Sequence, residues 1–170
     1  GNANAGTIYS VNTDGTGFSK IHDFDGVNGN HPQGALVALP DGKLAGIAVH
    51  GGSYGLGVLY TLNIDGTDYT VIKHFNDTRA SRGILLGSDG KLYGATSSTM
   101  TKGGVVYRIN PDGTGYTELK QFPVLPIDSE DSPSALIELP DGSLRGTTLY
   151  GTNGFGFVYA DGEYKTELPA

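Results

Sequence analysis

The sequence predicts an all-β protein made of repeated, four-stranded antiparallel units. Glycine is abundant, at 28 of 170 residues against about 7% in average proteins, and many glycines follow aspartate in the Asp-Gly pairs typical of β-hairpin turns. One set of these pairs has its glycines at positions 15, 66, 113 and 162, which are 51, 47 and 49 residues apart. No segment carries apolar residues at helical spacing over more than a turn or two, so we expect essentially no helix.

The first strand of each repeat is a tyrosine-bearing segment that ends in this Asp-Gly turn. Its copies read GTIYSVNTDGTGF, GVLYTLNIDGTDY, GVVYRINPDGTGY and a shortened GFVYADGEY, beginning at residues 6, 57, 104 and 156. Side chains alternate across a strand, so Val58, Tyr60 and Leu62 share one face. We expect these strands to be half-buried.

The second strand is the most polar of the four. Its copies FSKIHDF, YTVIKHF and YTELKQF end in Phe24, Phe75 and Phe122. Charged side chains on an edge strand discourage pairing with other chains. We therefore expect this strand at the outer edge of each unit.

The third strand is nearly all apolar, reading ALVAL, GILL and ALIEL at residues 35–39, 83–86 and 135–139. Such runs are typical of strands buried on both faces, so we expect these to be innermost. A second Asp-Gly turn and a fourth strand follow, as in DGKLAG, DGKLYG and DGSLRG. We interpret its recurring glycines, Gly46, Gly94 and Gly146, as sites of close backbone approach between neighbouring units.

Four-stranded antiparallel units, graded from an apolar inner to a polar outer strand, are typical of the blades of a β-propeller; a β-solenoid is the main alternative. The chain divides into an outer half-blade at residues 6–24 and blades at residues 33–75, 82–122 and 134–168, within one repeat domain over 1–170. Closed propellers have 4–8 blades, so about three and a half repeats predict an incomplete ring or part of an assembly. The missing blades would come from another chain or another copy.

The linked segments G-[TV]-[IV]-Y-x-[LVI]-N-x-D-G-T-G-[FY] and D-G-x-L-x-G resemble the GloVer tandem repeat of bacterial secreted and surface proteins with interchangeable C-terminal anchors. The resemblance covers nearly the whole chain. It implies propeller-like blades and an extracellular or cell-surface location. It supplies no catalytic residues, because the family has none established. The third copy departs from the pattern in its longer, acidic loop at Pro123–Pro133.

Composition and charge exclude several function classes. The net charge of −7 repels phosphate backbones and anionic lipids, so we expect no nucleic-acid partner and no membrane insertion. The chain has no cysteine, which removes disulfides and thiolate chemistry. It starts at Gly1 without an initiator methionine, so we expect a piece of a longer polypeptide from which a targeting segment is missing.

The long connections lie at the end of the blades opposite the Asp-Gly hairpins, and loops on a rigid scaffold are the usual seat of binding. Two histidines of one blade, His31 and His50, fall on this face. They form either an acid/base or metal pair or, as we prefer, ordinary polar loop residues beside proline and glycine.

Aromatic side chains in the same loops suit stacking on sugar rings, although they can equally cover the tops of the blades. The ligand-binding candidates are therefore His31, His50, Tyr54, Tyr150, Asn153 and Phe155.

Asp128, Glu130 and Asp131 stand close together and can bind a hard cation, or form a solvated acidic loop, which we favour. The N-x-D-G-T-G turns are superficially similar to calcium loops but lack the required ligands and the glutamate at the twelfth position. We interpret them as hairpins with local Asn and Asp hydrogen bonds. No cofactor is expected, with Ca²⁺ as the alternative.

Two function classes follow from these observations. The first is a non-catalytic extracellular or cell-surface module for binding or structural assembly, with glycan recognition through the long-loop face. The second is a carbohydrate-active enzyme, similar to a polysaccharide lyase, with His31 and His50 in its site. We favour the first, because an active site should make one blade distinctly richer in polar residues.

Overall fold

The protein is an all-β molecule in this computed structural model, which describes residues 4–124, 133–148, 157–160 and 163–166. The described residues form fourteen strands and no helix. The strands are β1 (Thr7–Ser10), β2 (Ser19–Asp23), β3 (Asn30–Ala38), β4 (Lys43–His50), β5 (Val58–Asn63), β6 (Thr70–His74), β7 (Arg79–Leu86), β8 (Leu92–Ser97), β9 (Val105–Ile109), β10 (Thr117–Gln121), β11 (Pro133–Glu138), β12 (Leu144–Thr148), β13 (Phe157–Ala160) and β14 (Glu163–Thr166).

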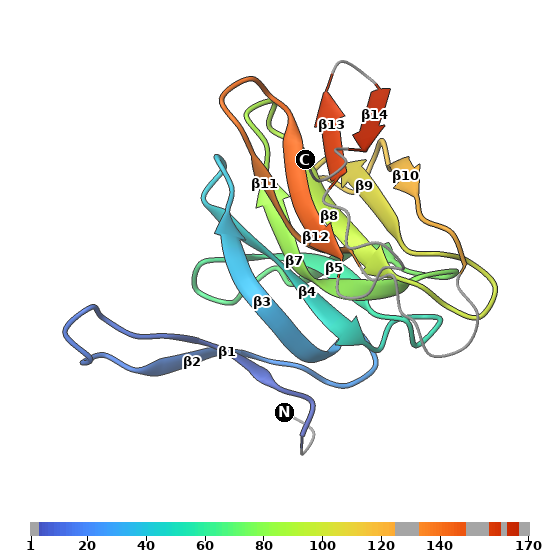
Figure 1. Ribbon diagram of the computed structural model, residues 1–170. Helices are drawn as coiled ribbons and strands as arrows, with labels where there is room; N and C mark the ends of the chain where they lie inside the picture. Colours follow the sequence, from blue (N-terminus) through green and yellow to red (C-terminus); the bar gives the residue numbers. More distant parts are fainter. Residues whose placement is uncertain (1–3, 125–132, 149–156, 161–162, 167–170) are drawn as a thin grey trace.

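The strands form three four-stranded sheets, each paired in chain order, and one two-stranded sheet. We call β3–β6 blade 1, β7–β10 blade 2, β11–β14 blade 3, and the pair β1–β2 the half-blade. Every strand pairing is antiparallel. Figure 1 shows the half-blade beside blade 1, with blade 3 at the far side of the molecule. The predicted fold class of propeller blades in an incomplete ring is confirmed.

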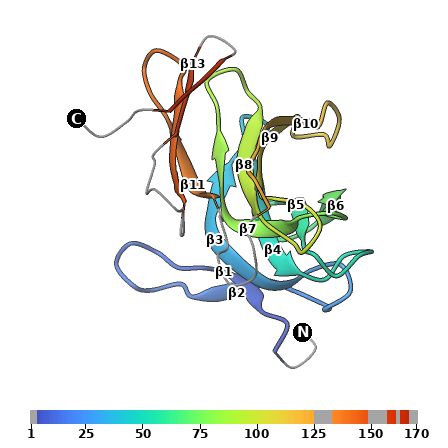
Figure 2. The same cartoon turned by 45° about the vertical axis from the view of Figure 1, so that its right-hand side comes forward.

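Neighbouring blades pack through their first two strands. Blades 1 and 2 meet where β3 and β4 contact β7, and blades 2 and 3 meet where β11 contacts β7 and β8. Figure 2 shows the sheets fanning outward from these strands. The order from inside to outside within each blade is therefore the predicted one.

The degree of burial differs from the prediction. The tyrosine-bearing strands β5 and β9 are almost wholly buried, whereas β3, expected to be buried on both faces, is largely exposed. In a closed ring an inner strand has neighbours on both sides. β3 has blade 2 on one side only, so Ala35 and Leu36 face solvent.

The recurring glycines pack against tyrosines of the same blade. Gly46 lies opposite Tyr60 in the β4–β5 ladder and Gly94 opposite Tyr107 in the β8–β9 ladder. A Cβ on either glycine would stand 2.6 Å from the tyrosine Cζ. The interpretation as a close approach between units is thus wrong at these positions, because the neighbour is a ring on the adjacent strand.

A second seam joins each outer strand to the Asp-Gly hairpin of the next blade. The His22 ring of β2 stacks on Tyr69 of blade 1, with centroids 4.3 Å apart and planes 8° apart. At the next seam Lys73 Nζ lies 4.0 Å from the ring centroid of Tyr116. The repeat therefore reproduces its contacts between units as well as its strands.

The Asn-x-Asp-Gly-Thr hairpins satisfy their own polar groups. In the β5–β6 turn, Asp65 Oδ1 accepts hydrogen bonds from the Thr67 backbone N–H at 3.0 Å and from its hydroxyl at 2.7 Å. Asn63 Nδ2 donates to Thr67 Oγ1 at 2.8 Å. The same contacts join Asn12, Asp14 and Thr16 in the half-blade and Asn110, Asp112 and Thr114 in blade 2. These turns are hairpins with local hydrogen bonds, as the sequence predicts.

Candidate binding face formed by the long loops

The long connections gather at one end of the blades. The strands of each sheet are antiparallel and paired in chain order, so the Asp-Gly hairpins lie at one end and the β2–β3, β4–β5, β6–β7 and β8–β9 connections at the other. We call this second end the long-loop face. It holds His31, His50 and Tyr54.

His31 and His50 come together at the edge of blade 1. The β3–β4 ladder pairs Asn30 with His50, which brings His31 next to it. Their rings contact edge to face, with centroids 5.3 Å apart and planes 89° apart. Both residues are exposed. Among the described residues, no carboxylate hydrogen-bonds or ion-pairs with either imidazole.

The backbone at His31 is strained. Its φ is +54°, a left-handed conformation that is uncommon outside glycine, and it precedes Pro32, a context that favours extended backbone instead. The His31 N–H donates to the Ala5 carbonyl at 2.9 Å. This hydrogen bond from the half-blade helps to hold the strained residue, and such strain often accompanies functional sites.

The two glycine-rich loops that adjoin His31 and His50 in the chain are fastened to each other. The Gly52 N–H donates to the Val27 carbonyl at 2.7 Å, which fastens the β4–β5 loop to the β2–β3 loop. At Gly51, where φ is +80°, a Cβ would stand 2.9 Å from the Gly26 carbonyl oxygen. The two loops can pack this closely because neither has a side chain at that point.

Asp25 fixes the β2–β3 loop. Its Oδ1 accepts the backbone N–H groups of Asn28 at 2.6 Å and Val27 at 2.8 Å, and its Oδ2 accepts from Asn28 Nδ2 at 2.8 Å. These bonds, chiefly the backbone one from Asn28, hold the pKa of the Asp25 carboxyl below its ordinary value. The loop therefore carries a fixed negative charge at neutral pH.

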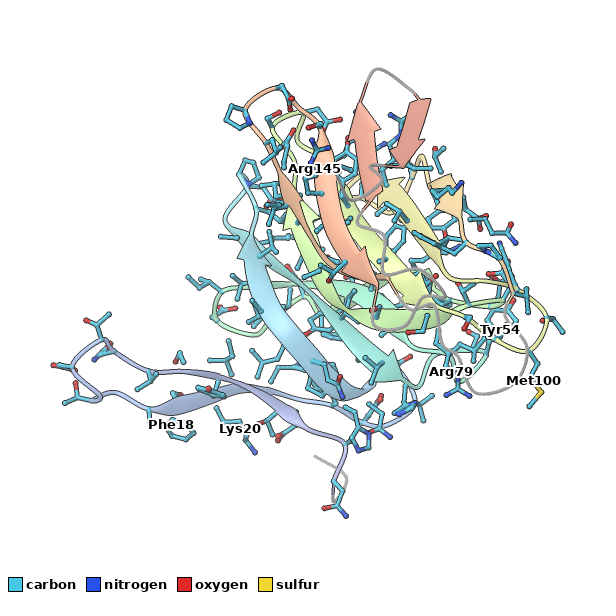
Figure 3. All side chains as sticks on the ribbon, viewed as in Figure 1. Phe18, Lys20, Tyr54, Arg79, Met100 and Arg145 are labelled. Carbon is cyan, nitrogen blue, oxygen red and sulfur yellow. The ribbon has the colours of Figure 1, made fainter. Side chains whose placement is uncertain are left out.

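Tyr54 occupies another part of the same face. Its side chain is 62% exposed, and Figure 3 shows it projecting at the end of the molecule where Met100 also projects. The Ser53 N–H donates to His74 Nδ1 at 3.1 Å, which draws this loop over the outer strand β6. No ring contact or hydrogen bond of the described residues links Tyr54 to the histidine pair.

The other candidates from the sequence lie outside the described residues. These are Tyr150, Asn153 and Phe155 among the ligand-binding candidates and Asp128, Glu130 and Asp131 among the metal candidates. Within the described ranges, no group of three or more His, Asp or Glu side chains could hold a metal ion. The described part of the chain also has no helix that could span a bilayer.

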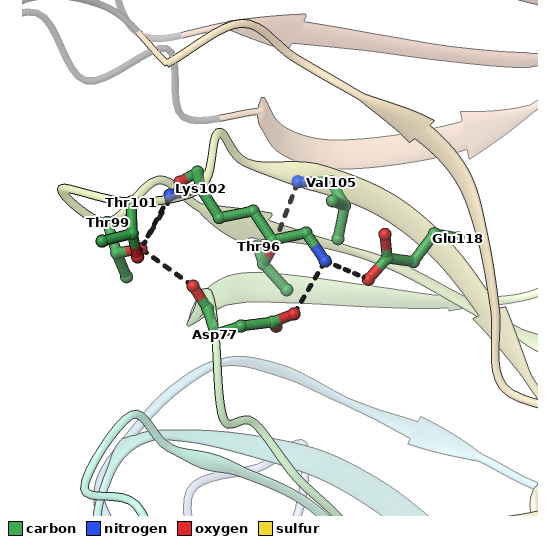
Figure 4. A network of polar contacts seen from close by, with 7 residues as sticks. All are labelled: Asp77, Thr96, Thr99, Thr101, Lys102, Val105 and Glu118. Carbon is green, nitrogen blue, oxygen red and sulfur yellow. Dashed lines mark hydrogen bonds and ion pairs between the residues drawn. The ribbon is translucent and has the colours of Figure 1, made fainter.

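Blade 2 carries an ion-pair network at the same end, which sequence reasoning missed. Lys102 Nζ lies 2.8 Å from Asp77 Oδ2 and 2.5 Å from Glu118 Oε1, and the Thr99 hydroxyl donates to the Asp77 carbonyl at 2.8 Å (Figure 4). Desolvation lowers the pKa of Lys102, but the hydrogen bonds to the two carboxylates outweigh it and raise that pKa overall. The three charges come from different segments, so no spacing in the sequence indicates them.

The two blades therefore differ at this face. Counting from the shared Asp-Gly turns at Gly42 and Gly90, Arg79 and Ser98 take the places of His31 and His50. The charges of Lys102, Asp77 and Glu118 in blade 2 are paired with one another, whereas Arg79 of the same blade is exposed. In blade 1 the exposed groups are the two imidazoles, which lie at the ends of strands β3 and β4 and not in loops as predicted.

The fold and its repeats identify the class of protein. The chain belongs to the Gloeobacter/Verrucomicrobia repeat family, whose family model matches residues 1–166. The resemblance predicted from the repeated segments is thereby confirmed. No curated protein matches the sequence.

Solved structures of similar fold come from proteins of several kinds. A putative gluconolactonase is 20% identical, with a TM-score of 0.64 over 95% of this chain and 55% of its own. The extracellular domain of a putative one-component system from B. thetaiotaomicron is 11% identical, with a TM-score of 0.65 over 98% of this chain and 20% of its own. An oligogalacturonate lyase in complex with manganese is 19% identical, with a TM-score of 0.62 over 91% of this chain and 40% of its own. This chain thus spans about half of these structures or less, and the likeness shows the fold alone.

Proposed function

We propose that the protein is a non-catalytic extracellular or cell-surface repeat module that binds a glycan through the long-loop face of blade 1. The observation that carries the proposal is the exposed His31–His50 pair, which has no carboxylate partner among the described residues. A carboxylate partner often orients the imidazole of a catalytic histidine. Two imidazoles with free ring nitrogens can instead donate and accept hydrogen bonds to sugar hydroxyls.

The rigid loops support this role. A binding site benefits when its groups are held in place before the ligand arrives, because less conformational entropy is lost on binding. The Gly52–Val27 hydrogen bond and the Asp25 turn fix the loops that adjoin the two histidines in the chain. Exposed Tyr54 offers a ring for stacking on the same face. The location outside the cell rests on the family resemblance, and the net charge of −7 argues against nucleic acid as the partner.

A glycan array tests this proposal. We expect the protein to bind at least one class of polysaccharide, and His31→Asn or His50→Gln to weaken that binding about tenfold, the effect of losing roughly 1.4 kcal/mol of contact. Asparagine is chosen at position 31 because it tolerates the left-handed backbone. Ile64→Ala is the matched control, since Ile64 is exposed on a hairpin at the opposite end. No binding to any glycan would overturn the proposal.

A carbohydrate-active enzyme is the second candidate, favoured by the strained φ of +54° at His31. Strain of this kind often accompanies catalytic residues, and the fold is shared with an oligogalacturonate lyase. Incubation with acidic polysaccharides, followed by ultraviolet absorbance of unsaturated products, separates the two. Product release that is lost in both histidine variants would establish the enzyme and reject the non-catalytic module.

A further inference from the structure

The half-blade has one edge without a partner strand. In blades 1 and 2 the tyrosine-bearing strand is central, with a glycine-bearing strand on its inner side. The corresponding strand of the half-blade is β1, which pairs with β2 and with no other strand of the described residues. The backbone groups along its inner edge are therefore open for pairing.

Tyr9 on β1 is exposed, although its equivalents in the complete blades are buried. It stands in the place of Tyr60 and Tyr107, which are 1% and 0% exposed, but its own exposure is 59%. The Tyr9 ring nevertheless contacts Phe18 in the same way as the buried Tyr107 contacts Tyr116. The rings of Tyr9 and Phe18 are 5.6 Å apart at 32°, and those of Tyr107 and Tyr116 are 5.5 Å apart at 33°. Tyr9 thus has the conformation of a buried blade tyrosine without the strand that buries it.

A pocket lies between the half-blade and blade 1, beside the unpaired edge of β1. Its volume is about 370 Å³, and it is lined by Thr7, Ile8 and Tyr9 of β1 and by Gln33, Ala35 and Leu36 of β3, among others. Leu36 is 37% exposed, whereas Leu136, its equivalent in blade 3, is 8% exposed. Both walls of the pocket are surfaces that a neighbouring pair of strands covers elsewhere in the molecule.

We propose that the inner edge of β1 binds a two-stranded β-hairpin of this same repeat, with an Asp-Gly turn and a glycine placed opposite Tyr9. The two complete ladders of blades 1 and 2 specify this partner, because only glycine leaves room for the tyrosine ring that crosses it. Both strands of the hairpin would pack on β3, as β3 and β4 pack on β7. The binding would complete a four-stranded blade.

The hairpin comes from an additional repeat and not from a second copy of these residues. The hairpins β3–β4, β7–β8 and β11–β12 are each already paired within their own sheets. A second copy could supply one only by opening a complete blade, which would expose buried strands such as β5 and β9. This inference is independent of the proposed role of the histidine pair.

A labelled synthetic hairpin with the sequence of residues 33–50 tests the inference against the intact chain. We expect it to bind and to protect the β1 amides from hydrogen exchange. The matched peptide carries Gly46→Leu, which places a side chain against Tyr9, and its affinity should fall at least about tenfold. Tyr9→Ala in the protein should weaken the unchanged peptide to a similar extent, whereas Ile64→Ala should not.

A fusion protein tests the same inference without a separate peptide that has to fold by itself. Residues 33–50 are placed directly before Gly1, so that residues 1–6 serve as the connection into β1. We expect a higher melting temperature than for the unfused chain, and loss of that increase when the added copy carries Gly46→Leu. Failure of both the peptide and the fusion to protect β1 would overturn the inference. Protection of β1 that instead rises with protein concentration alone would assign the edge to a second copy, which also overturns it.

Discussion

Tyr107 lies across Gly94 on the neighbouring strand so closely that a Cβ at position 94 would stand 2.6 Å from the Tyr107 Cζ. The same relationship joins Tyr60 to Gly46. These pairs bury two of the largest side chains of the core. They also explain why the repeat keeps a glycine inside a strand, where glycine is otherwise unfavourable.

Gly94→Ala should destabilise the protein by about 1–3 kcal/mol, because an added methyl in a packed core forces side chains and backbone apart. Urea denaturation measures the loss. Gly83→Ala is the control in the same sheet, since a Cβ there would meet Ala135 only at 3.4 Å. Equal stability of the two variants would show that Tyr107 can move aside without cost.

Tyr107→Phe should stabilise the protein, by about 1 kcal/mol. The Tyr107 hydroxyl is buried and has no hydrogen-bond partner among the described residues, and an unpaired buried hydroxyl is costly. Tyr69→Phe should have the opposite effect, because the Tyr69 hydroxyl donates to the Asn28 carbonyl at 2.8 Å. Thermal denaturation of both variants checks the difference in sign, and a loss of stability in both would contradict it.

Acidification should loosen the seam between the half-blade and blade 1. Burial, opposed by Asp23 and Asp25, lowers the pKa of His22 from its ordinary value of 6.5. The His22 side chain of the unfolded chain therefore binds a proton more readily than that of the folded protein. The free energy of unfolding is highest above pH 6.5 as far as His22 is concerned, and it falls as the pH drops below that value.

His22→Phe keeps a ring on Tyr69 but cannot titrate. We therefore expect the unfolding free energy of the variant to depend less on pH below 6.5 than that of the wild type, measured by denaturation at several pH values. The pKa values of carboxyls such as Asp25 and Asp65 are lowered below 3.8, so these groups stay ionised through most of this window. An unchanged pH dependence in the variant would assign the effect to another group.

Thr67→Val should raise the pKa of Asp65 towards its ordinary value of 3.8. The Thr67 side chain makes the hydrogen bond that contributes most to lowering this pKa, and its backbone N–H contributes next. Valine removes the hydroxyl while keeping the backbone donor. An NMR titration of the Asp65 carboxyl measures the change, with Asp112 in the unaltered β9–β10 turn as the internal reference.

The sequence predicts the strands and their order in each blade, because hairpin turns and apolar runs are local features. It does not predict the burial of β3, which depends on what lies beside the strand in the ring. Nor does it predict that the recurring glycines pack against tyrosines of their own blade, since spacing along the chain does not indicate which neighbour a glycine faces.

Only part of the candidate site can be predicted from the sequence. The prediction that His31 and His50 share a face rests on strand order, and the β3–β4 register then places their rings in contact. The Lys102 network joins residues of three separate segments, so no local pattern could reveal it. The sequence and strand order indicate only that Asp77 and Lys102 lie in connections at the same end of the blades, which does not establish an ion pair.

Residue-resolved hydrogen exchange of the unfused chain tests whether three complete blades accompany a half-blade with an open edge. We expect slow exchange along β5 and β9, which are buried and paired on both sides. We expect fast exchange for the β1 amides that point away from β2. Protection of all β1 amides at a level equal to that of β5 and β9 would show that the β1 edge is not open.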